Sequence, residues 1–317
     1  MLDLPPRPKE IVPIVVDGPL SAVERSWQLR PPQNTLVIIV RGTCSLMPGG
    51  STQLSISPQL PMGDLFYADD PAGSLRHPSD LAPFKPLADV TLVGHAYRRS
   101  ARSGVSVAQL AVGPLRRAVA VIGDRTWQGE VPSEPRSWTR IPLRWELAFG
   151  GPGHEPNPVG RGIDGQLLPN LENPDSLIVG PRDRPQPACF APLAHTWPAR
   201  SSKLGTYDQA WQRDRWPYFP ADFDWSYFNA APAAQQIPYL RGDESFDLAG
   251  VHADHAVLSG RLPGLTARIF AQYSSEAGGA FRDGVANLDP VACDAGVLSV
   301  AWVWRAMLVV SQESAPA

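Results

Sequence analysis

Proline restricts the structures that this chain can form. Its 317 residues include 35 prolines, roughly twice the usual share of about 5%. Because proline lacks a backbone N–H and its ring clashes with the preceding helical turn, it is excluded from helix interiors. Seventeen of the prolines lie between residues 131 and 240, and only three follow residue 240. The sequence therefore predicts few and short helices.

Short apolar runs rich in β-branched residues lie on both sides of this proline-rich segment. They span residues 36–40, 90–93, 105–110, 119–122, 256–258, 266–273 and 297–307. Glycine and proline separate them at intervals that suit strands joined by turns. The pattern predicts a mainly β fold of antiparallel sheets, arranged as a sandwich or an open barrel.

We expect one domain over residues 1–317, with three parts. An N-terminal β region covers residues 10–130, a loop-rich segment covers 131–250, and C-terminal strands cover 251–310. The last strands would complete the first sheet, which would protect its edges. Two separate lobes are the alternative organisation.

The loop-rich segment is also rich in large aromatic residues. Six of the ten tryptophans fall between residues 131 and 240, and eight aromatic residues lie between Trp211 and Phe228. A linker that buries nothing is poor in such side chains. The segment is therefore predicted to be folded around its own aromatic core, with a protein-binding surface as the second interpretation.

Charge and hydropathy narrow the classes of function. The chain has 28 basic and 31 acidic residues, a net charge of -3, which leaves no basic surplus for a nucleic-acid backbone. Its longest apolar runs are far shorter than the ~20 residues that cross a bilayer, and its N-terminus does not look like an export signal. We expect a cytoplasmic protein with no nucleic-acid partner and no membrane insertion.

Signatures of catalysis are missing from the sequence. There is no G-x-S-x-G motif, and the glycines of residues 149–153 lack the spacing of a phosphate-binding loop. Cys44, Cys189 and Cys293 are too far apart for a zinc site and are predicted to be buried thiols. His252 and His255 are predicted to lie in a surface turn. No catalytic residue, cofactor or metal is therefore predicted.

Two carboxylates of the loop-rich segment could bind a divalent cation. Asp222 and Asp224 lie on the same side of the chain if it is extended. The interpretation we favour is structural, because Asp side chains satisfy backbone N–H groups where sheet partners are scarce.

A series of short motifs follows in fixed order along the chain. These are residues 142–151 (PLRWELAFGG), 157–162 (NPVGRG), 168–172 (LPNLE), 197–200 (WPAR), 205–208 (GTYD) with Trp211, 220–224 (PADFD), 228–232 (FNAAP) with Gln235, and 242–244 (GDE). The series resembles the bacterial type VI secretion accessory family catalogued as domain of unknown function twenty-one sixty-nine. The resemblance covers roughly residues 10 to 308 and includes 85–86 with Asp89 and Val90, 94–96, 123–127 and 304–305.

The resemblance implies a cytoplasmic, non-enzymatic adaptor or chaperone. Such a protein helps to load its cognate toxic effector onto the spike-tip protein of the secretion machine, and these two proteins are the expected partners. The candidate residues for partner binding or for structural motifs are Asn157, Gly160, Arg161, Gly162, Asn170, Glu172, Arg200, Gly205, Thr206, Asp208, Trp211, Asp222, Asp224, Phe228, Asn229, Gln235, Asp243 and Glu244.

Elementary chemistry suggests roles for some of these motif residues. Gly160, Gly162 and Gly205 would allow positive φ or close approach of two chain segments. Asn157 would cap a turn before Pro158.

Arginine pairing would add rigidity to the same loops. Arg161 and Arg200 would donate to carboxylates such as Asp208 or Asp224.

Two other functions compete with the adaptor. One is a carbohydrate- or peptidoglycan-acting hydrolase that uses paired carboxylates from Glu146, Asp224 or Glu244. The other is a structural subunit of the secretion apparatus.

Overall fold

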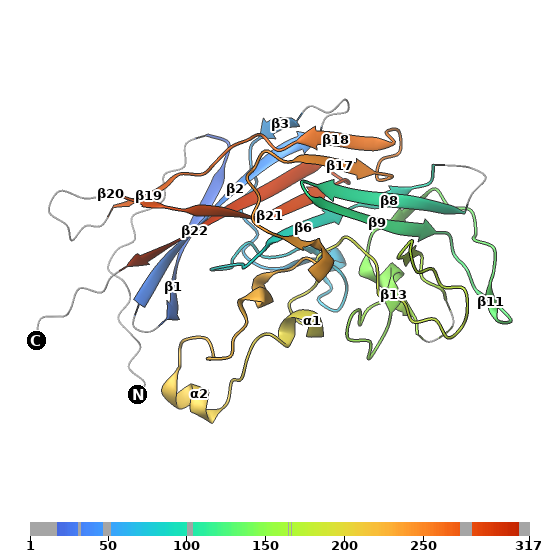
Figure 1. Cartoon of the computed structure of the whole chain (residues 1–317), viewed down its shortest axis with the longest axis horizontal. Coiled ribbons are helices and arrows are strands. Elements are labelled where there is room, and N and C mark those ends of the chain that lie inside the picture. Colours follow the sequence, from blue (N-terminus) through green and yellow to red (C-terminus); the bar gives the residue numbers. More distant parts are fainter. Residues whose placement is uncertain are drawn as a thin grey trace, which may run out of the picture.

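Two large β-sheets and a loop-rich segment make up the computed structural model (Figure 1). It describes residues 18–30, 33–46, 52–99, 104–163, 165, 167–272 and 281–310. The described part of the chain is mainly β, as predicted, and its sheets do not close into a barrel.

The larger sheet combines strands from both ends of the chain. Its order is β1 (Ser21–Arg30), β2 (Gln33–Leu46), β22 (Ser299–Val310), β21 (Ala286–Asp294), β6 (Ala88–Val93) and β16 (Gln236–Ile237), with β3 (Thr52–Ser55) paired to β2. Only the β21–β6 pair in this sheet is parallel. The C-terminal strand β22 thus lies between the N-terminal β2 and β21.

The second sheet is fully antiparallel. Its order is β15 (Leu171–Glu172), β9 (Leu115–Ile122), β8 (Val105–Val112), β17 (Ser245–Ala249) and β18 (Val257–Arg261).

Five small pairs complete the described strands: β4 (Leu65–Phe66) with β5 (Leu75–His77), β7 (His95–Tyr97) with β12 (Arg140–Pro142), β10 (Trp127–Gln128) with β11 (Val131–Pro132), β13 (Phe149–Gly150) with β14 (Arg161–Gly162), and β19 (Ile269–Gln272) with β20 (Phe281–Gly284).

The helices of the described residues are short, as the prolines require. They are α1 (Pro198–Ser201), α2 (Gln209–Asp214) and the 3₁₀ turns η1 (Tyr67–Asp69), η2 (Trp145–Leu147), η3 (Trp225–Phe228) and η4 (Ala233–Gln235). None of them has the length and apolar character that crossing a bilayer demands.

The predicted strands are present, but some of them begin or end at other residues than predicted. β18 and β22 begin one and two residues later than predicted, at Val257 and Ser299. Before β22, the Asp294 carboxylate accepts hydrogen bonds from the backbone N–H groups of Gly296 and Val297 and closes a turn. Of the predicted run 266–273, β19 covers Ile269–Gln272, and residue 273 lies outside the described residues.

The two sheets share one core of buried side chains. This cluster contains Trp302 and Trp304 of β22 together with Leu110 of β8, Val121 of β9 and Leu248 of β17. The side of β22 that faces away from the core is also buried at Ala301, Val303 and Arg305, although Met307 is exposed. Leu60 and Leu81 pack there against Val37, Ile39 and Val303. Because both sides are covered, β22 reads as a nearly continuous apolar run instead of an alternating one.

A glycine allows one of the large core residues to fit. Gly42 of β2 lies opposite Trp302 of β22, and a Cβ at position 42 would clash with the indole ring. The indole therefore occupies the space that a side chain at position 42 would need.

We expect Gly42→Ala to lower the free energy of unfolding by about 2 kcal/mol, because the added methyl group overpacks a filled core. Urea unfolding followed by tryptophan fluorescence measures this loss. Gly63→Ala is the matched control, since a Cβ there meets nothing within 4 Å. Equal stability of the two variants would contradict the role assigned to Gly42.

Candidate functional site

The candidate residues divide into a buried group and a surface group. Asn157, Asn170, Glu172, Arg200, Asn229 and Gln235 are buried. Thr206, Asp208, Asp222 and Asp224 are exposed, and Trp211, Asp243 and Glu244 are half-buried. Burial thus separates residues that hold the fold from residues that a partner could reach.

Asn229 and Gln235 attach the loop-rich segment to β6. Asn229 Nδ2 donates to the Leu87 carbonyl at 2.8 Å and to Asp89 Oδ1 at 3.0 Å. Gln235 Nε2 donates to the carbonyls of Val90, at 2.9 Å, and Phe190, at 3.0 Å. These two motif residues act as hydrogen-bonded links between a loop and a strand.

Asn157 does not cap a turn with its side chain, contrary to the prediction. Its Nδ2 donates to the carbonyls of Trp145, at 2.9 Å, and Phe149, at 3.0 Å. Gly160 lies so close that a Cβ there would clash with this amide, which confirms the expected close approach. Asn157 is fully buried. Its side chain therefore holds the interior of the loop together and does not cap a turn at Pro158.

Asn170 and Glu172 hold the next motif against β9 and its loop. Asn170 Nδ2 donates to the Ile122 carbonyl at 2.8 Å. Glu172 forms a buried ion pair with Arg125, and its Oε2 accepts from the backbone N–H of Ile178 at 2.8 Å. Burial raises the pKa of Glu172, and these two interactions oppose the rise.

The predicted pairing of the motif arginines with Asp208 or Asp224 was wrong. Arg200 Nε donates to the Tyr227 carbonyl at 2.9 Å, and Nη1 donates to the Leu193 carbonyl at 2.8 Å. Arg161 Nε donates to the Glu146 carbonyl at 3.1 Å. In a segment with little regular structure, backbone carbonyls need donors, and these guanidinium groups supply them.

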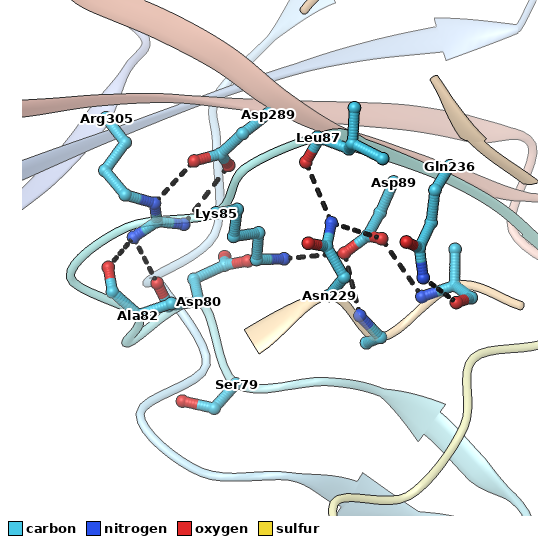
Figure 2. A network of polar contacts seen from close by, with 12 residues as sticks. Ser79, Asp80, Ala82, Lys85, Leu87, Asp89, Asn229, Gln236, Asp289 and Arg305 are labelled. Atoms are coloured by element: carbon cyan, nitrogen blue, oxygen red, sulfur yellow. Dashed lines mark hydrogen bonds and ion pairs between the residues drawn. The ribbon is translucent and has the colours of Figure 1, made fainter. Parts of the chain in front are cut away.

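A buried network of four charged side chains connects the segment to the larger sheet (Figure 2). Asp89 accepts from Lys85 Nζ at 2.9 Å and from the backbone N–H groups of Ala230 and Ala231, at 2.9 and 3.1 Å. All four charged members, Lys85, Asp89, Asp289 and Arg305, are at most 4% exposed.

Arg305 completes the network with a forked contact. Its Nε and Nη2 donate to the two oxygens of Asp289, at 2.6 and 3.2 Å. Nη1 donates to the carbonyls of Asp80, at 2.9 Å, and Ala82. Burial raises the pKa of the Asp289 carboxyl, while Arg305 and Lys85 favour its charged form.

Sequence reasoning missed Asp289 of this network. The motif series includes Asp89 beside the motif at 85–86, but neither aspartate is among the candidate residues for partner binding or structural motifs. A signal was present, because Arg305 interrupts an otherwise apolar strand. A charge in such a strand indicates a buried partner.

The exposed motif residues gather on one projection, residues 203–224, which we call the α2 lobe. In Figure 1, α2 lies at the lower edge of the view, below the two large sheets. Gly205 has φ of 76°, and next to it Thr206 donates to Asp222 from its backbone N–H, at 3.0 Å, and from its hydroxyl, at 2.8 Å. These hydrogen bonds hold the pKa of Asp222 below its usual range.

Two more carboxylates of this region cap helical turns. Asp208 Oδ1 accepts from the Trp211 backbone N–H at 2.8 Å and begins α2. Asp224 Oδ1 accepts from the Ser226 backbone N–H at 2.9 Å and begins η3. Together with the Thr206 contacts of Asp222, these bonds confirm the structural role predicted for Asp222 and Asp224.

An aromatic cluster supports the lobe from within. Phe219 and Phe223 have ring centroids 4.3 Å apart, and Phe219 and Phe228 both pack on Trp27 of β1. The prediction of an aromatic core in this segment is confirmed. Two aromatic side chains of the lobe stay exposed, Tyr207 at 48% and Trp216 at 38%.

A hollow of about 270 Å³ opens on the lobe. Its lining includes Thr206, Asp208, Trp211, Asp214, Arg215 and Asp222. The Trp211 indole is fixed, because its Nε1 donates to the Tyr218 carbonyl at 2.8 Å. The lobe thus presents a preformed hollow whose lining includes one aromatic residue, Trp211.

The three carboxylates named for a hydrolase all accept hydrogen bonds in the structure. Glu146 accepts from the Ser74 backbone N–H at 2.7 Å and from its hydroxyl at 2.5 Å. Glu244 accepts from the backbone N–H groups of Arg241 and Gly242, at 2.7 and 2.9 Å. Glu146, Glu244 and Asp224 are absent from the lining of the hollow and from the lining of another cavity, which includes Asp289 and Arg305.

The remaining candidates have local roles. Asp243 forms exposed ion pairs with Arg241 and Arg261. His252 and His255 lie in a turn, where His252 Nδ1 accepts from the His255 backbone N–H at 3.2 Å. Within the described ranges, no group of three or more His, Cys, Asp or Glu side chains is placed to hold a metal ion. Cys44, Cys189 and Cys293 are buried free thiols, as predicted.

We expect Asp89→Ala to destabilise the protein by about 3–5 kcal/mol, because it leaves the buried Lys85 charge uncompensated and frees two buried N–H groups. Urea unfolding measures the loss. Asp175→Ala removes an exposed carboxylate and is expected to leave the unfolding midpoint unchanged. A loss below about 1 kcal/mol for Asp89→Ala, the net value of an ordinary hydrogen bond, would show that the network is not required.

A comparison with protein families gives one match. The model of a family described as "uncharacterized protein conserved in bacteria (DUF2169)" matches residues 32–305. No curated protein and no solved structure matches the chain.

Proposed function

Since the chain belongs to the bacterial DUF2169 family, we propose that it is a non-enzymatic adaptor or chaperone of a type VI secretion system. In this proposal it acts in the bacterial cytoplasm and helps to load a toxic effector onto the spike-tip protein. The secretion link comes from the motif resemblance. The observation that supports a role in binding is the α2 lobe. Motif residues that lie outside the buried core surround a preformed hollow there.

The exposed aromatic side chains support a protein partner. Tyr207 and Trp216 lie on the same lobe as the hollow, and Tyr207 packs against Trp211 with ring centroids 4.7 Å apart. Tyrosine and tryptophan are enriched among the residues that dominate the binding energy of protein interfaces. Exposed aromatic groups on a projection therefore fit a docking role.

The way the lobe is held also supports binding. Asp222 is bonded to Thr206 and Asp208 caps α2, so the loop is ordered before a partner arrives. A surface that is ordered in advance loses less conformational entropy on binding. An adaptor built largely of loops can in this way hold a partner firmly.

We expect affinity isolation of the tagged protein from its native bacterium to recover a spike-tip protein and one toxin, identified by mass spectrometry. Recovery of the protein alone would contradict the adaptor proposal. Stoichiometric retention in the assembled machine, with loss of assembly on deletion, would instead favour a structural subunit.

We expect Tyr207→Ala to reduce recovery of the partner by about tenfold, because loss of an aromatic anchor at an interface costs more than about 1 kcal/mol. Its unfolding midpoint should change little, since Tyr207 is 48% exposed. Val131→Ala is the control, because Val131 is exposed at 58% and lies outside the lobe. Equal recovery by both variants would place the contact surface elsewhere.

A further inference from the structure

We propose that the hollow of the α2 lobe binds a basic side chain, arginine or lysine, that an extended segment of the partner protein presents. This inference rests on the proposed function and specifies the chemistry of the contact. Three features of the hollow support it: its size, its charge and its aromatic lining residue.

The size of the hollow fits one side chain. Its volume of about 270 Å³ is below the roughly 300–1,000 Å³ of pockets that enclose drug-sized ligands and cofactors. Ala210 and Ala221 contribute small apolar groups to its lining. The hollow therefore has room for one large side chain, with apolar groups beside its stem.

The charge of the hollow favours a cation. Its lining contains three carboxylates, Asp208, Asp214 and Asp222, and one guanidinium, Arg215. Arg213 already forms a forked pair with Asp214, with both contacts at 2.7 Å. Asp208 and Asp222 therefore supply the negative charge that remains for a partner, and Arg215 offsets part of it. The three carboxylates exceed the guanidinium groups of Arg213 and Arg215 by one charge, so the hollow favours a cation over an anion.

The two remaining carboxylates have acceptor capacity to spare. Asp208 uses Oδ1 to cap α2, and the described contacts leave its Oδ2 without a donor. Asp222 receives one hydrogen bond on each oxygen from Thr206, and a carboxylate offers about four acceptor positions. A guanidinium or ammonium group can therefore be satisfied without breaking the contacts that hold the lobe.

The aromatic lining residue favours the same ligand. A cation over a tryptophan face gains about 0.5–1 kcal/mol at an exposed site. Trp211 belongs to the lining of the hollow, and the hydrogen bond from its Nε1 to the Tyr218 carbonyl fixes the orientation of its ring. A basic side chain that enters the hollow would thus meet an aromatic surface and carboxylates together.

The test uses short peptides of the form acetyl-Gly-Gly-X-Gly-Gly-amide, in which X is arginine, lysine, norleucine or glutamate. Each is titrated into the full-length protein with ¹⁵N-labelled tryptophan, and the Trp211 indole signal is assigned with Trp211→Phe. We expect the arginine and lysine peptides to shift this signal, with weaker binding at 0.5 M salt because the charges are screened. An equal response to norleucine would show an apolar site and overturn the proposal, as would no response to any peptide.

Asp208→Asn isolates the contribution of charge. Asparagine caps helices about as well as aspartate, so the variant keeps α2 while it removes one negative charge. We expect it to bind the arginine peptide about threefold more weakly, the upper part of the range for an exposed ion pair. Asp175→Asn, which removes an exposed carboxylate outside the hollow, should bind as the unaltered protein does. Equal binding by the two variants would overturn the role of Asp208.

The same variants separate this inference from the proposed function. If the unaltered protein recovers a toxin and a spike-tip protein, and Asp208→Asn recovers them equally well at every salt concentration, the hollow is not the contact and the adaptor role stands. If the arginine peptide binds but no toxin or spike-tip protein is recovered, the adaptor role fails and the binding site stands.

Discussion

A buried carboxylate holds residues 229–231 of the loop-rich segment against the larger sheet. Asp89 of β6 accepts four hydrogen bonds, from Lys85, from the Asn229 side chain and from the backbone N–H groups of Ala230 and Ala231. A loop without sheet partners must satisfy its N–H groups in some other way. A carboxylate on a strand does so and fixes the loop relative to the sheet. Lys85 makes the burial tolerable, because an unpaired charge at this depth would be strongly destabilising.

Hydrogen bonds in the opposite direction, from side chains to backbone carbonyls, recur along the segment and explain how a proline-rich chain remains ordered. Asn157 and Gln235 donate to backbone carbonyls, as does Arg200. Proline removes a donor but leaves its carbonyl free, so a chain rich in proline has more carbonyls than N–H groups. Side chains that can donate two hydrogen bonds, such as those of asparagine, glutamine and arginine, supply the donors that these carbonyls need. The buried members of the motif series are largely residues of this kind.

The sequence was sufficient for the class of fold and not for the contacts that hold it. β-branched runs located strands such as β6 and β8, and the aromatic density between Trp211 and Phe228 indicated a core. In contrast, Asn229 and Asp89 are 140 residues apart, and no spacing rule connects them. Arg200 was assigned to a carboxylate because charge suggested it, whereas its actual acceptors are carbonyls, which every residue has and no sequence pattern marks. Local chemistry was therefore predictable, and the long-range partners were not.

The carboxylates of the α2 lobe show why a structural role and a binding role are not alternatives. Asp208 and Asp222 are held by hydrogen bonds to Trp211 and Thr206, so their rotamers are already fixed in the free protein. Ordering a free polar side chain at an interface costs roughly 0.5–1.5 kcal/mol, and a carboxylate that already caps a turn avoids that cost. The same hydrogen bonds also lower the pKa of Asp222 and keep it charged. A capping aspartate at the mouth of a hollow is thus better prepared to meet a cation than a mobile surface carboxylate would be.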